Sequence, residues 1–226
     1  MKLSNRLMKI AQLIPRGARI ADIGTDHAYL PVYCVQNKIS PCALAMDINE
    51  GPLSAAHANV CKYGVGSGIE LRLSDGLSAL EADEADVIVI AGMGGLLIRN
   101  IIDAKPSAAK TSLLILQPMN AAKELREYLY SSGYCIQNEY IAHEPGKYYN
   151  IILAKTGDDT ADDEDMIVGR NVYKTSPEEF SGYMKSRINT LKKITDGIGK
   201  SDTADGSTAE HELEVYERTL KKYEGK

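Results

Sequence analysis

A short segment near the amino terminus carries the residues best placed for cofactor chemistry. It runs from residue 19 to residue 31 and reads Arg-Ile-Ala-Asp-Ile-Gly-Thr-Asp-His-Ala-Tyr-Leu-Pro. The pattern predicts a short buried strand, a turn containing Gly24 and an apolar-faced helix. This arrangement receives a nucleotide-bearing cofactor at the carboxyl end of the first strand of a Rossmann-like sheet. One glycine is a weak signal, so the neighbouring charges decide which cofactor fits.

Asp26 occupies the turn in which a dinucleotide would place its pyrophosphate. Dinucleotide-binding sequences have glycines there, because their backbone N–H groups face the phosphates. A carboxylate repels phosphate and attracts the ammonium and sulfonium groups of S-adenosylmethionine, by roughly 1 to 4 kcal/mol at about 4 Å. The turn therefore favours S-adenosylmethionine and disfavours a nicotinamide cofactor. The alternative is that Asp26 only caps the next helix.

Acidic residues also end the first three predicted strands. Asp22, at the end of the first strand, is expected beneath the methionine portion of the cofactor. Asp47 ends a strand over residues 42–47, where a carboxylate accepts hydrogen bonds from ribose hydroxyls; the alternative is a helix cap. Asp75 and Gly76 follow a strand over residues 69–73, where the acid accepts from the adenine amino group or forms a simple turn.

A glycine-rich turn, Gly92–Gly95, follows the fourth strand and is the predicted meeting point of methyl group and acceptor. Its three glycines permit close approach to the backbone, and Met93 offers an adaptable apolar contact. Gln117 and Pro118 end the next strand and are expected to wall the same cleft. No nucleophilic Ser/His/Asp or Cys/His arrangement stands out. That fits methyl transfer, in which the protein mainly positions the reactants.

The predicted elements that position these residues alternate between strand and helix. Strands are predicted over 19–23, 42–47, 69–73, 85–91 and 112–116, and helices over 3–14, 29–37, 51–63 and 121–131, with another from the glycine-rich turn through 102. Two extended runs, 134–142 and 148–155, then follow without an intervening helix. The fold class is therefore α/β, a mostly parallel Rossmann-like sheet with an antiparallel carboxyl-terminal edge pair, the layout of class I methyltransferases.

The composition changes after residue 156. Residues 157–165 are polar and acidic and predict a linker. Residues then recur at alternating steps of three and four in two mainly apolar runs: Phe180, Met184, Arg187/Ile188, Leu191, Ile194 and Ile198, then Ala209, Leu213, Tyr216, Leu220 and Tyr223. The spacing predicts two helices, broken within residues 197–207, as an antiparallel hairpin or coiled coil; a dimerising coiled coil is the alternative. The predicted domains are 1–157, binding S-adenosylmethionine, and 158–226, helical and coiled-coil-like.

The composition limits the classes of protein. The chain has 226 residues, 44% hydrophobic and 25% charged, as in an ordinary globular protein. Apolar runs are too short to span a bilayer, and no secretory signal is evident. The four cysteines form no Cys-x-x-Cys pair, and the four histidines are scattered. We expect a cytoplasmic protein, monomeric or weakly dimeric, without a membrane partner or a metal site.

The net charge of −5 is unevenly distributed. Residues 1–157 contain 15 basic and 15 acidic residues, whereas residues 158–226 contain 11 and 16. The first twenty residues carry five basic side chains and no acidic one: Lys2, Arg6, Lys9, Arg16 and Arg19. This pattern fits a local basic face for a nucleic acid, and equally an ordinary solvated helix face.

Seven motifs occur in order along the chain: Leu3–Leu7, Ile20–Pro31, Asp47–Leu53, Ser74–Leu77, Ala91–Gly95, Gln117–Met119 and Lys147–Tyr149. Together they resemble the bacterial tRNA adenine-22 N1-methyltransferases. The general class I pattern is Asp/Glu-x-Gly-x-Gly-x-Gly. This chain keeps Asp22 and Gly24 but has Asp26 and Ala28 at the later glycines, as is typical of this family.

The resemblance implies S-adenosylmethionine as methyl donor and N1 of adenine 22, in the D-arm of tRNA, as acceptor. It also places Asp26, His27 and Tyr29 along the active cleft. The expected catalytic residues are Asp26, Tyr29 and Met93. The expected cofactor-binding residues are Asp22, Gly24, Thr25, Asp26, His27, Asp47, Ile48, Asp75, Gly76, Gly92 and Met93. The expected substrate-binding residues are Arg6, Lys9, Gly94, Gly95, Gln117, Pro118, Lys147 and Tyr148.

The product of N1 methylation is cationic, so Asp26 is expected to stabilise the developing charge, with Tyr29 stacking or hydrogen-bonding. Because N1 lies on the Watson–Crick edge, the base must be extruded. Basic residues of the first helix and the helical hairpin are expected to hold the RNA backbone. The alternatives are a methyltransferase of another RNA or a small molecule, and a non-catalytic RNA-binding module with a vestigial cofactor pocket.

Overall fold

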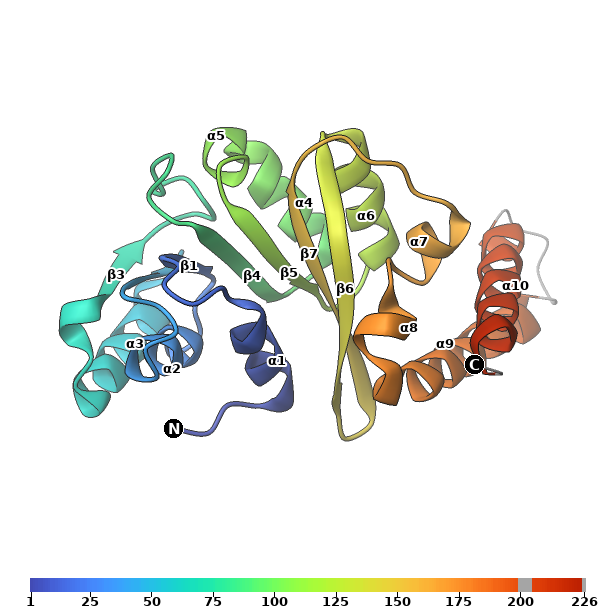
Figure 1. The fold of residues 1–226 in the computed structure, drawn as a ribbon, viewed down its shortest axis with the longest axis horizontal. Helices are drawn as coiled ribbons and strands as arrows, with labels where there is room; N and C mark the ends of the chain where they lie inside the picture. The colour runs from blue at the N-terminus through green and yellow to red at the C-terminus, as the bar shows by residue number, and fades with distance from the viewer. Residues whose placement is uncertain (199–204, 225–226) are drawn as a thin grey trace. The chain divides into compact units, whose positions relative to one another are not determined.

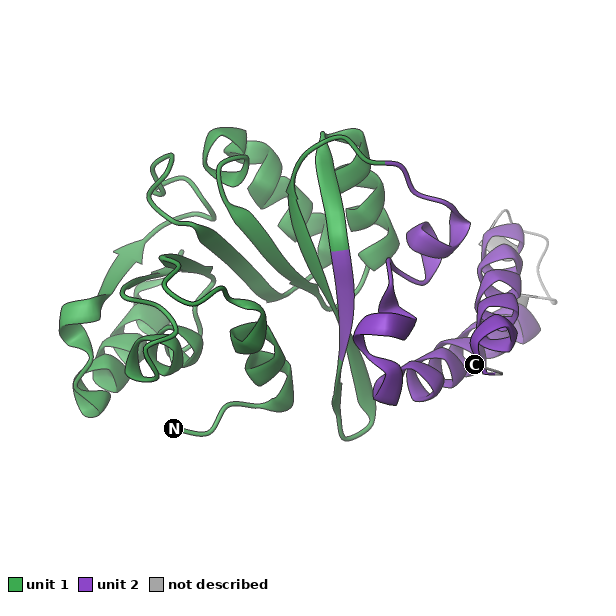
Figure 2. Cartoon of the chain, in the orientation of Figure 1, with its two compact units in different colours: residues 1–137, 142–159 green, residues 138–141, 160–226 purple. Residues whose placement is uncertain are grey.

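The computed structural model describes residues 1–198 and 205–224 of the chain. It divides into two compact units (Figure 2). Unit 1 comprises Met1–Gln137 and Ala142–Asp159, and unit 2 comprises Asn138–Ile141 and Thr160–Lys226. The boundary predicted between residues 157 and 158 lies near this division. The sequence did not indicate that a short piece of a strand, residues 138–141, groups with the helices.

One mixed sheet organises the first unit (Figure 1). Its strands are β1 (Ile20–Ile23), β2 (Ala43–Asp47), β3 (Ile69–Leu73), β4 (Val87–Met93), β5 (Leu113–Pro118), β6 (Tyr134–Glu144) and β7 (Lys147–Thr156), in the order β3-β2-β1-β4-β5-β7-β6. The pairs from β3 to β5 are parallel, and β7 runs antiparallel to β5. The predicted Rossmann-like fold with an antiparallel edge pair is confirmed.

Six α-helices belong to the described part of unit 1: α1 (Asn5–Leu13), α2 (Tyr29–Gln36), α3 (Glu50–Tyr63), α4 (Gly95–Ala104), α5 (Pro106–Ala109) and α6 (Ala122–Ser131). The hydroxyl of Ser4 caps α1 by accepting a hydrogen bond from the Leu7 N–H group at 3.4 Å. The short helix α5 was not predicted. Pro106 ends α4 because proline has no N–H group to donate within a helix. The same property suits the first position of a helix, and α5 begins at this residue.

The strand order places a ligand site at the carboxyl edge of the sheet. The chain adds β2 and β3 on one side of β1, then returns to add β4 and β5 on the other. Loops leave the sheet in opposite directions on the two sides of this switch point, and open α/β sheets bind ligands in the resulting crevice. All four residues of β1 are buried, as are Val87–Ile90 of β4. A rigid core therefore supports the turns that carry most of the predicted site residues.

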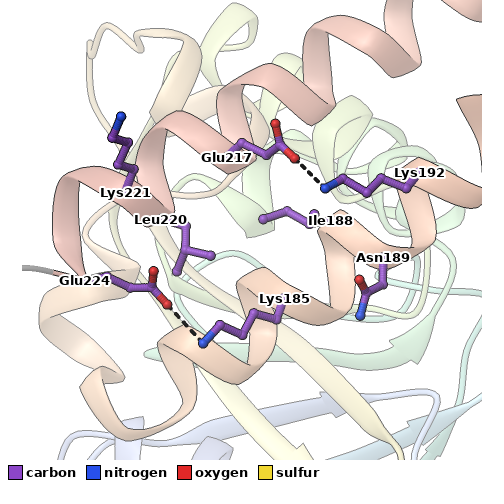
Figure 3. Close-up of a pocket in the computed structure, with 8 residues that line it drawn as sticks. All are labelled: Lys185, Ile188, Asn189, Lys192, Glu217, Leu220, Lys221 and Glu224. Carbon is purple, nitrogen blue, oxygen red and sulfur yellow. Dashed lines mark ion pairs between the residues drawn. The ribbon is translucent and has the colours of Figure 1, made fainter.

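Unit 2 is helical apart from its short strand segment. Its described helices are α7 (Asp163–Ile167), α8 (Val172–Thr175), α9 (Pro177–Ile198) and α10 (Asp205–Tyr223). Lys185 pairs with Glu224 at 3.0 Å and Lys192 with Glu217 at 2.7 Å (Figure 3), so α9 and α10 run antiparallel as predicted.

Two boundaries of the helical unit bear on the predictions. The predicted break within residues 197–207 lies largely outside the described residues, because residues 199–204 are not described. The predicted linker over 157–165 is too long, because α7 already begins at Asp163. The carboxylate of Asp162 caps this helix by accepting from the Asp165 N–H group at 2.8 Å. None of the described helices combines the length and apolarity needed to cross a membrane.

Candidate active site

The turn between β1 and α2 is built on unusual backbone geometry. Gly24 has φ +70°, and the non-glycine residues His27 and Ala28 have φ +58° and +52°. Glycine adopts this conformation readily, whereas for His27 and Ala28 it costs about 1 to 3 kcal/mol each and occurs where the surrounding structure enforces it. One enforcing contact comes from α3, where the side-chain amide of Asn59 donates to the His27 carbonyl at 2.9 Å. Because Ala28 occupies the cap position without a side-chain bond, the alternative that Asp26 caps α2 is wrong.

Three predicted residues meet on the outer side of this turn. The Asp26 Oδ1 atom lies 3.1 Å from His27 Nε2. The rings of His27 and Tyr29 stack, with centroids 5.3 Å apart and an interplanar angle of 26°. The Asp26 side chain is 82% exposed, and Tyr29 is also exposed. A carboxylate and an aromatic platform are thus available together at the carboxyl edge of the sheet.

Asp22 lies on the inner side of the same turn and is buried. The Thr25 hydroxyl donates a hydrogen bond to its Oδ2 atom at 2.6 Å. Burial raises the pKa of Asp22 to about 6, although the Thr25 hydrogen bond and the charge of Arg6 oppose the shift. The ionised form of such a carboxyl group needs a cation nearby. The ammonium group of S-adenosylmethionine meets that need.

The acid at the end of β2 and the acid after β3 lie at the same carboxyl edge of the sheet as Asp22. The Asp47 Oδ1 atom accepts a hydrogen bond from the Asn49 N–H group at 2.8 Å. Since Asn49 is the cap residue of α3, the alternative that Asp47 caps this helix is wrong. Asp75 is exposed in the turn after β3, where the next residue, Gly76, has φ +53°.

Two large apolar side chains lie beside these acids and are more than half exposed: Ile48 after Asp47, and Leu73 at the end of β3. The edge therefore offers a buried carboxylate for an ammonium group and further carboxylates for hydroxyl and amino groups. Its open apolar side chains suit a flat heterocycle. This set of groups fits S-adenosylmethionine. Among the described residues, no cluster of His, Cys, Asp or Glu suits a metal ion.

Met93 reaches from the end of β4 to the turn after β1. A Cβ atom placed on Gly24 would lie 2.1 Å from the Met93 Cε methyl group, so a side chain at Gly24 would collide with it. The structure thus brings Met93 and Gly24 together, as expected for two residues assigned to one cofactor site.

The glycine-rich turn after β4 only partly matches its prediction. A Cβ atom on Gly95 would lie 2.2 Å from the Ala121 carbonyl oxygen, and one on Gly94 would lie 3.0 Å from Asn120 Oδ1. The Gly95 N–H group also donates to the Asn120 carbonyl at 3.0 Å. The predicted contact of Gly95 with a substrate is therefore wrong, because this residue is buried against the loop before α6, whereas the contact of the half-buried Gly94 stays a prediction. Gly92, with φ +79°, remains exposed.

Gln117 does not line a cleft, contrary to prediction, because its side chain is fully buried. Its Oε1 atom accepts hydrogen bonds from Arg6 Nη1 at 2.6 Å and from the Gly92 N–H group at 3.1 Å. Its amide nitrogen donates to the carbonyl of Pro118 at 2.9 Å. Pro118 is buried as well. Both residues therefore support the glycine-rich turn from within, and their predicted substrate contact is wrong.

The first helix joins the hairpin formed by β6 and β7. The Arg6 N–H group donates to Glu144 Oε1 at 3.1 Å, and its guanidinium lies 5.5 Å from the centroid of the Tyr149 ring. Lys147 Nζ lies 5.1 Å from the same centroid, and the ring of Tyr148 stacks on His143 at 4.5 Å. The register of β7 along β5 carries this hairpin tip beyond the carboxyl end of β5, toward the edge that holds the other site residues.

Two of the five basic side chains predicted to form a basic face in the first twenty residues are already held by partners within the chain. The guanidinium of Arg6 is held by Gln117, and that of Arg19 pairs with Asp86 at 2.8 Å. Sequence reasoning missed Asn59, Glu144 and Asn120, which hold the site through contacts between distant segments. Tyr149 could have been found from the sequence, since it belongs to the motif Lys147–Tyr149.

Comparisons with known proteins agree with this geometry. A family model described as "Methyltransferase domain" matches residues 3–152. The Bacillus subtilis tRNA (adenine(22)-N(1))-methyltransferase is 46% identical over 159 residues, which cover 70% of this chain and 67% of that relative.

Two solved structures extend the match over nearly the whole chain. A putative tRNA (m1A22) methyltransferase of Streptococcus pneumoniae, in complex with S-adenosyl-L-methionine, has a TM-score of 0.84 and 31% identity, covering 97% of this chain and 100% of that one. TrmK of M. capricolum, in complex with S-adenosyl-homocysteine, has a TM-score of 0.84 and 30% identity, covering 99% and 100%. The chain therefore belongs to the family of tRNA (adenine(22)-N(1))-methyltransferases.

Proposed function

We propose that this chain transfers the methyl group of S-adenosylmethionine to N1 of adenine 22 in tRNA. Besides family membership, the proposal is supported by the turn between β1 and α2. It joins a buried carboxylate, Asp22, to an exposed carboxylate, Asp26, and an aromatic pair. The inner carboxylate suits the cation of the cofactor, and the outer group suits a base that becomes cationic when methylated.

Residues on three adjacent strands would hold the cofactor. Asp22 would accept from its ammonium group, Asp47 from its ribose hydroxyls and Asp75 from its adenine amino group. Ile48 and Leu73 would cover the faces of the adenine ring. The backbone of Gly24, Thr25, Gly76 and Gly92 and the side chain of Met93 would complete the site. When bound, S-adenosylmethionine supplies an electrophilic methyl group.

The chain itself contributes positioning and charge. Adenine N1 already carries a lone pair, so attack needs no general base. The Asp26 carboxylate would stabilise the positive charge that develops on the base. Its exposure weakens this effect until the base covers it and excludes water. The stacked rings of His27 and Tyr29 offer a platform for the extruded adenine.

The RNA backbone would be held at the hairpin tip and the first helix. Lys147 and Lys9 provide charge there, and Tyr148 provides a ring. Arg6, held by Gln117, would mainly fix the first helix to the glycine-rich turn. We further propose that the protein acts in the cytoplasm, where tRNA is found, as a monomer or weak dimer.

The function is tested with unmodified tRNA transcripts and labelled S-adenosylmethionine. Digestion to nucleosides should place the label in N1-methyladenosine, and sequencing should place it at position 22. A transcript with guanine at position 22 serves as the matched control and should take up no label. Label at another nucleotide, or cofactor binding without transfer to any tRNA, would contradict the proposal.

A further inference from the structure

Two leucines at the start of α4 are exposed beside the candidate site. Leu96 is 47% exposed and Leu97 is 51% exposed, whereas Gly95, Ile98 and Ile102 form the buried face of the same helix. Met119, after β5, is exposed as well. We call Leu96, Leu97 and Met119 the apolar rim. Large apolar side chains that are open to water beside a ligand site are candidates for a binding role.

The apolar rim is fixed to the edge where methyl transfer is proposed. The Met119 N–H group donates to the Met93 carbonyl at 2.8 Å, and the Gly95 N–H group donates to the Asn120 carbonyl at 3.0 Å. The start of α4 is therefore tied to the loop that begins at Met119. Contact between Gly95 and Ala121 leaves no room for the helix to move closer. The backbone that carries the rim is consequently held next to Met93.

A cation accompanies the apolar rim on α4. Arg99 lies three residues after Leu96, on the same side of the helix. Its guanidinium contacts the neutral Asn100 side-chain oxygen at 3.2 and 3.3 Å. Within residues 1–198 and 205–224, no carboxylate lies at ion-pair distance from it. Apolar side chains that enter a base stack beside a cation that contacts phosphate are a known way of holding distorted nucleic acid.

We propose that Leu96 and Leu97, supported by Met119, occupy the space that adenine 22 leaves when it is extruded from the tRNA stack. This inference rests on the proposed function. Extrusion is more costly for a paired base than for one that is already unpaired. Side chains that fill the vacated space stabilise the extruded state, so their contribution is needed most when the target is paired.

The test compares two tRNA transcripts that differ only in the nucleotide opposite adenine 22. One carries uridine there and pairs the target, and the other carries an abasic residue and leaves it unpaired. Single-turnover methyl transfer is measured with saturating cofactor. For the double variant Leu96→Ala/Leu97→Ala, we expect a loss of more than tenfold on the paired transcript and of less than threefold on the unpaired one. The matched variant Leu96→Met/Leu97→Met keeps the apolar bulk and should stay within threefold of wild type on both.

Each other outcome contradicts the inference. An equal loss on both transcripts would show general docking, and no loss on either would show that the leucines are not used. A change in the oligomeric state of the free double variant, with unchanged transfer, would identify a protein interface. Absence of transfer by the wild type to either transcript would contradict the proposed function itself. The thermal midpoint and the affinity for S-adenosylhomocysteine confirm that each variant is folded, and both single variants are measured alongside.

Discussion

The two units of this chain differ in net charge. Unit 1 holds consecutive left-handed residues, His27 and Ala28, and a buried carboxyl group, Asp22, at one edge of its sheet. Each is unfavourable for folding and is maintained by surrounding contacts. Strained residues and buried carboxyl groups often occur at functional sites, and these features support the proposed site at the carboxyl edge of the sheet.

Unit 2 also holds a left-handed residue, Asn171, and a buried acid, Glu139, so the contrast between the units lies in charge. Several of its surface cations pair with acids: Lys185 with Glu224, Lys192 with Glu217, Lys222 with Glu164 and Arg170 with Asp165. Unit 2 carries 11 basic and 15 acidic residues, a net charge of −4 out of the −5 of the whole chain. Paired cations on an acidic unit attract phosphate weakly. The comparison favours unit 1 for the proposed chemistry and for most of the phosphate attraction, and four experiments can break or sharpen it.

The largest effect is expected at Asp26. Replacement by asparagine keeps the shape but removes the charge that would stabilise the methylated base, so turnover should fall about 100-fold. Affinity for S-adenosylhomocysteine, measured by calorimetry, should change by less than about threefold, because Asp26 is exposed and Asp22 still holds the ammonium group. The matched control Asp83→Asn, in the loop before β4 at the opposite edge, should leave turnover unchanged. Full turnover by Asp26→Asn would remove the electrostatic role.

A pair of glycine substitutions compares packing in the two units. Gly95→Ala places a Cβ atom 2.2 Å from the Ala121 carbonyl oxygen. We expect a loss of about 2 to 4 kcal/mol in the free energy of unfolding. Gly197→Ala in α9 meets nothing within 4 Å and should stabilise the protein by about 0.5 to 1 kcal/mol, since alanine favours a helix. Chemical denaturation measures both, and equal effects would contradict the contrast.

The pH dependence of cofactor binding tests Asp22. Its pKa of about 6, against an ordinary value of 3.8, means that the folded protein holds this proton more tightly than the unfolded chain. The contribution of Asp22 to stability is therefore present below about pH 4 and lost as the pH rises through about 6. Cofactor affinity should change in the opposite direction, because the carboxylate binds the ammonium group. Affinity at pH 5 should be about tenfold lower than at pH 7.5.

The variant Asp22→Asn separates these two effects. It should bind the cofactor weakly at every pH, with no titration near pH 6, and be about 1 to 3 kcal/mol more stable than wild type at pH 7.5. Calorimetric titration and thermal unfolding across pH 5 to 8 provide both quantities. A variant that keeps the wild-type pH profile would show that another group titrates.

The smallest effect concerns single lysines on the two units. Lys147→Ala at the hairpin tip should weaken tRNA binding a few fold and reduce the slope of log affinity against log salt by about 1. Lys192→Ala removes a cation that Glu217 already pairs, so the slope should stay unchanged and stability should fall by less than about 1 kcal/mol. A larger change in slope for Lys192→Ala than for Lys147→Ala would indicate that the phosphate contacts lie on the helical unit.

Local patterns in the sequence were sufficient for the strand order, the longer helices and the acids at the ends of β1 and β2, but not for the short helices α5, α7 and α8. Each depends on residues close together in the chain, through alternation of apolar side chains, capping preference or position after a strand. The cofactor preference of the turn over Gly24–Ala28 was also predicted from the sequence, because its carboxylate and its single glycine disfavour a dinucleotide.

Only the tertiary structure decided which of these residues face the ligand. Arg6 and Gln117 are 111 positions apart and Asn59 lies 32 positions from His27, so no local pattern reveals their hydrogen bonds. The glycine at 95 looked open because a sequence shows small size but not what fills the adjacent space. Gln117 looked like a cleft residue because it ends a strand. Its side chain is buried partly because α1, which is distant in the sequence, packs there and Arg6 bonds to it.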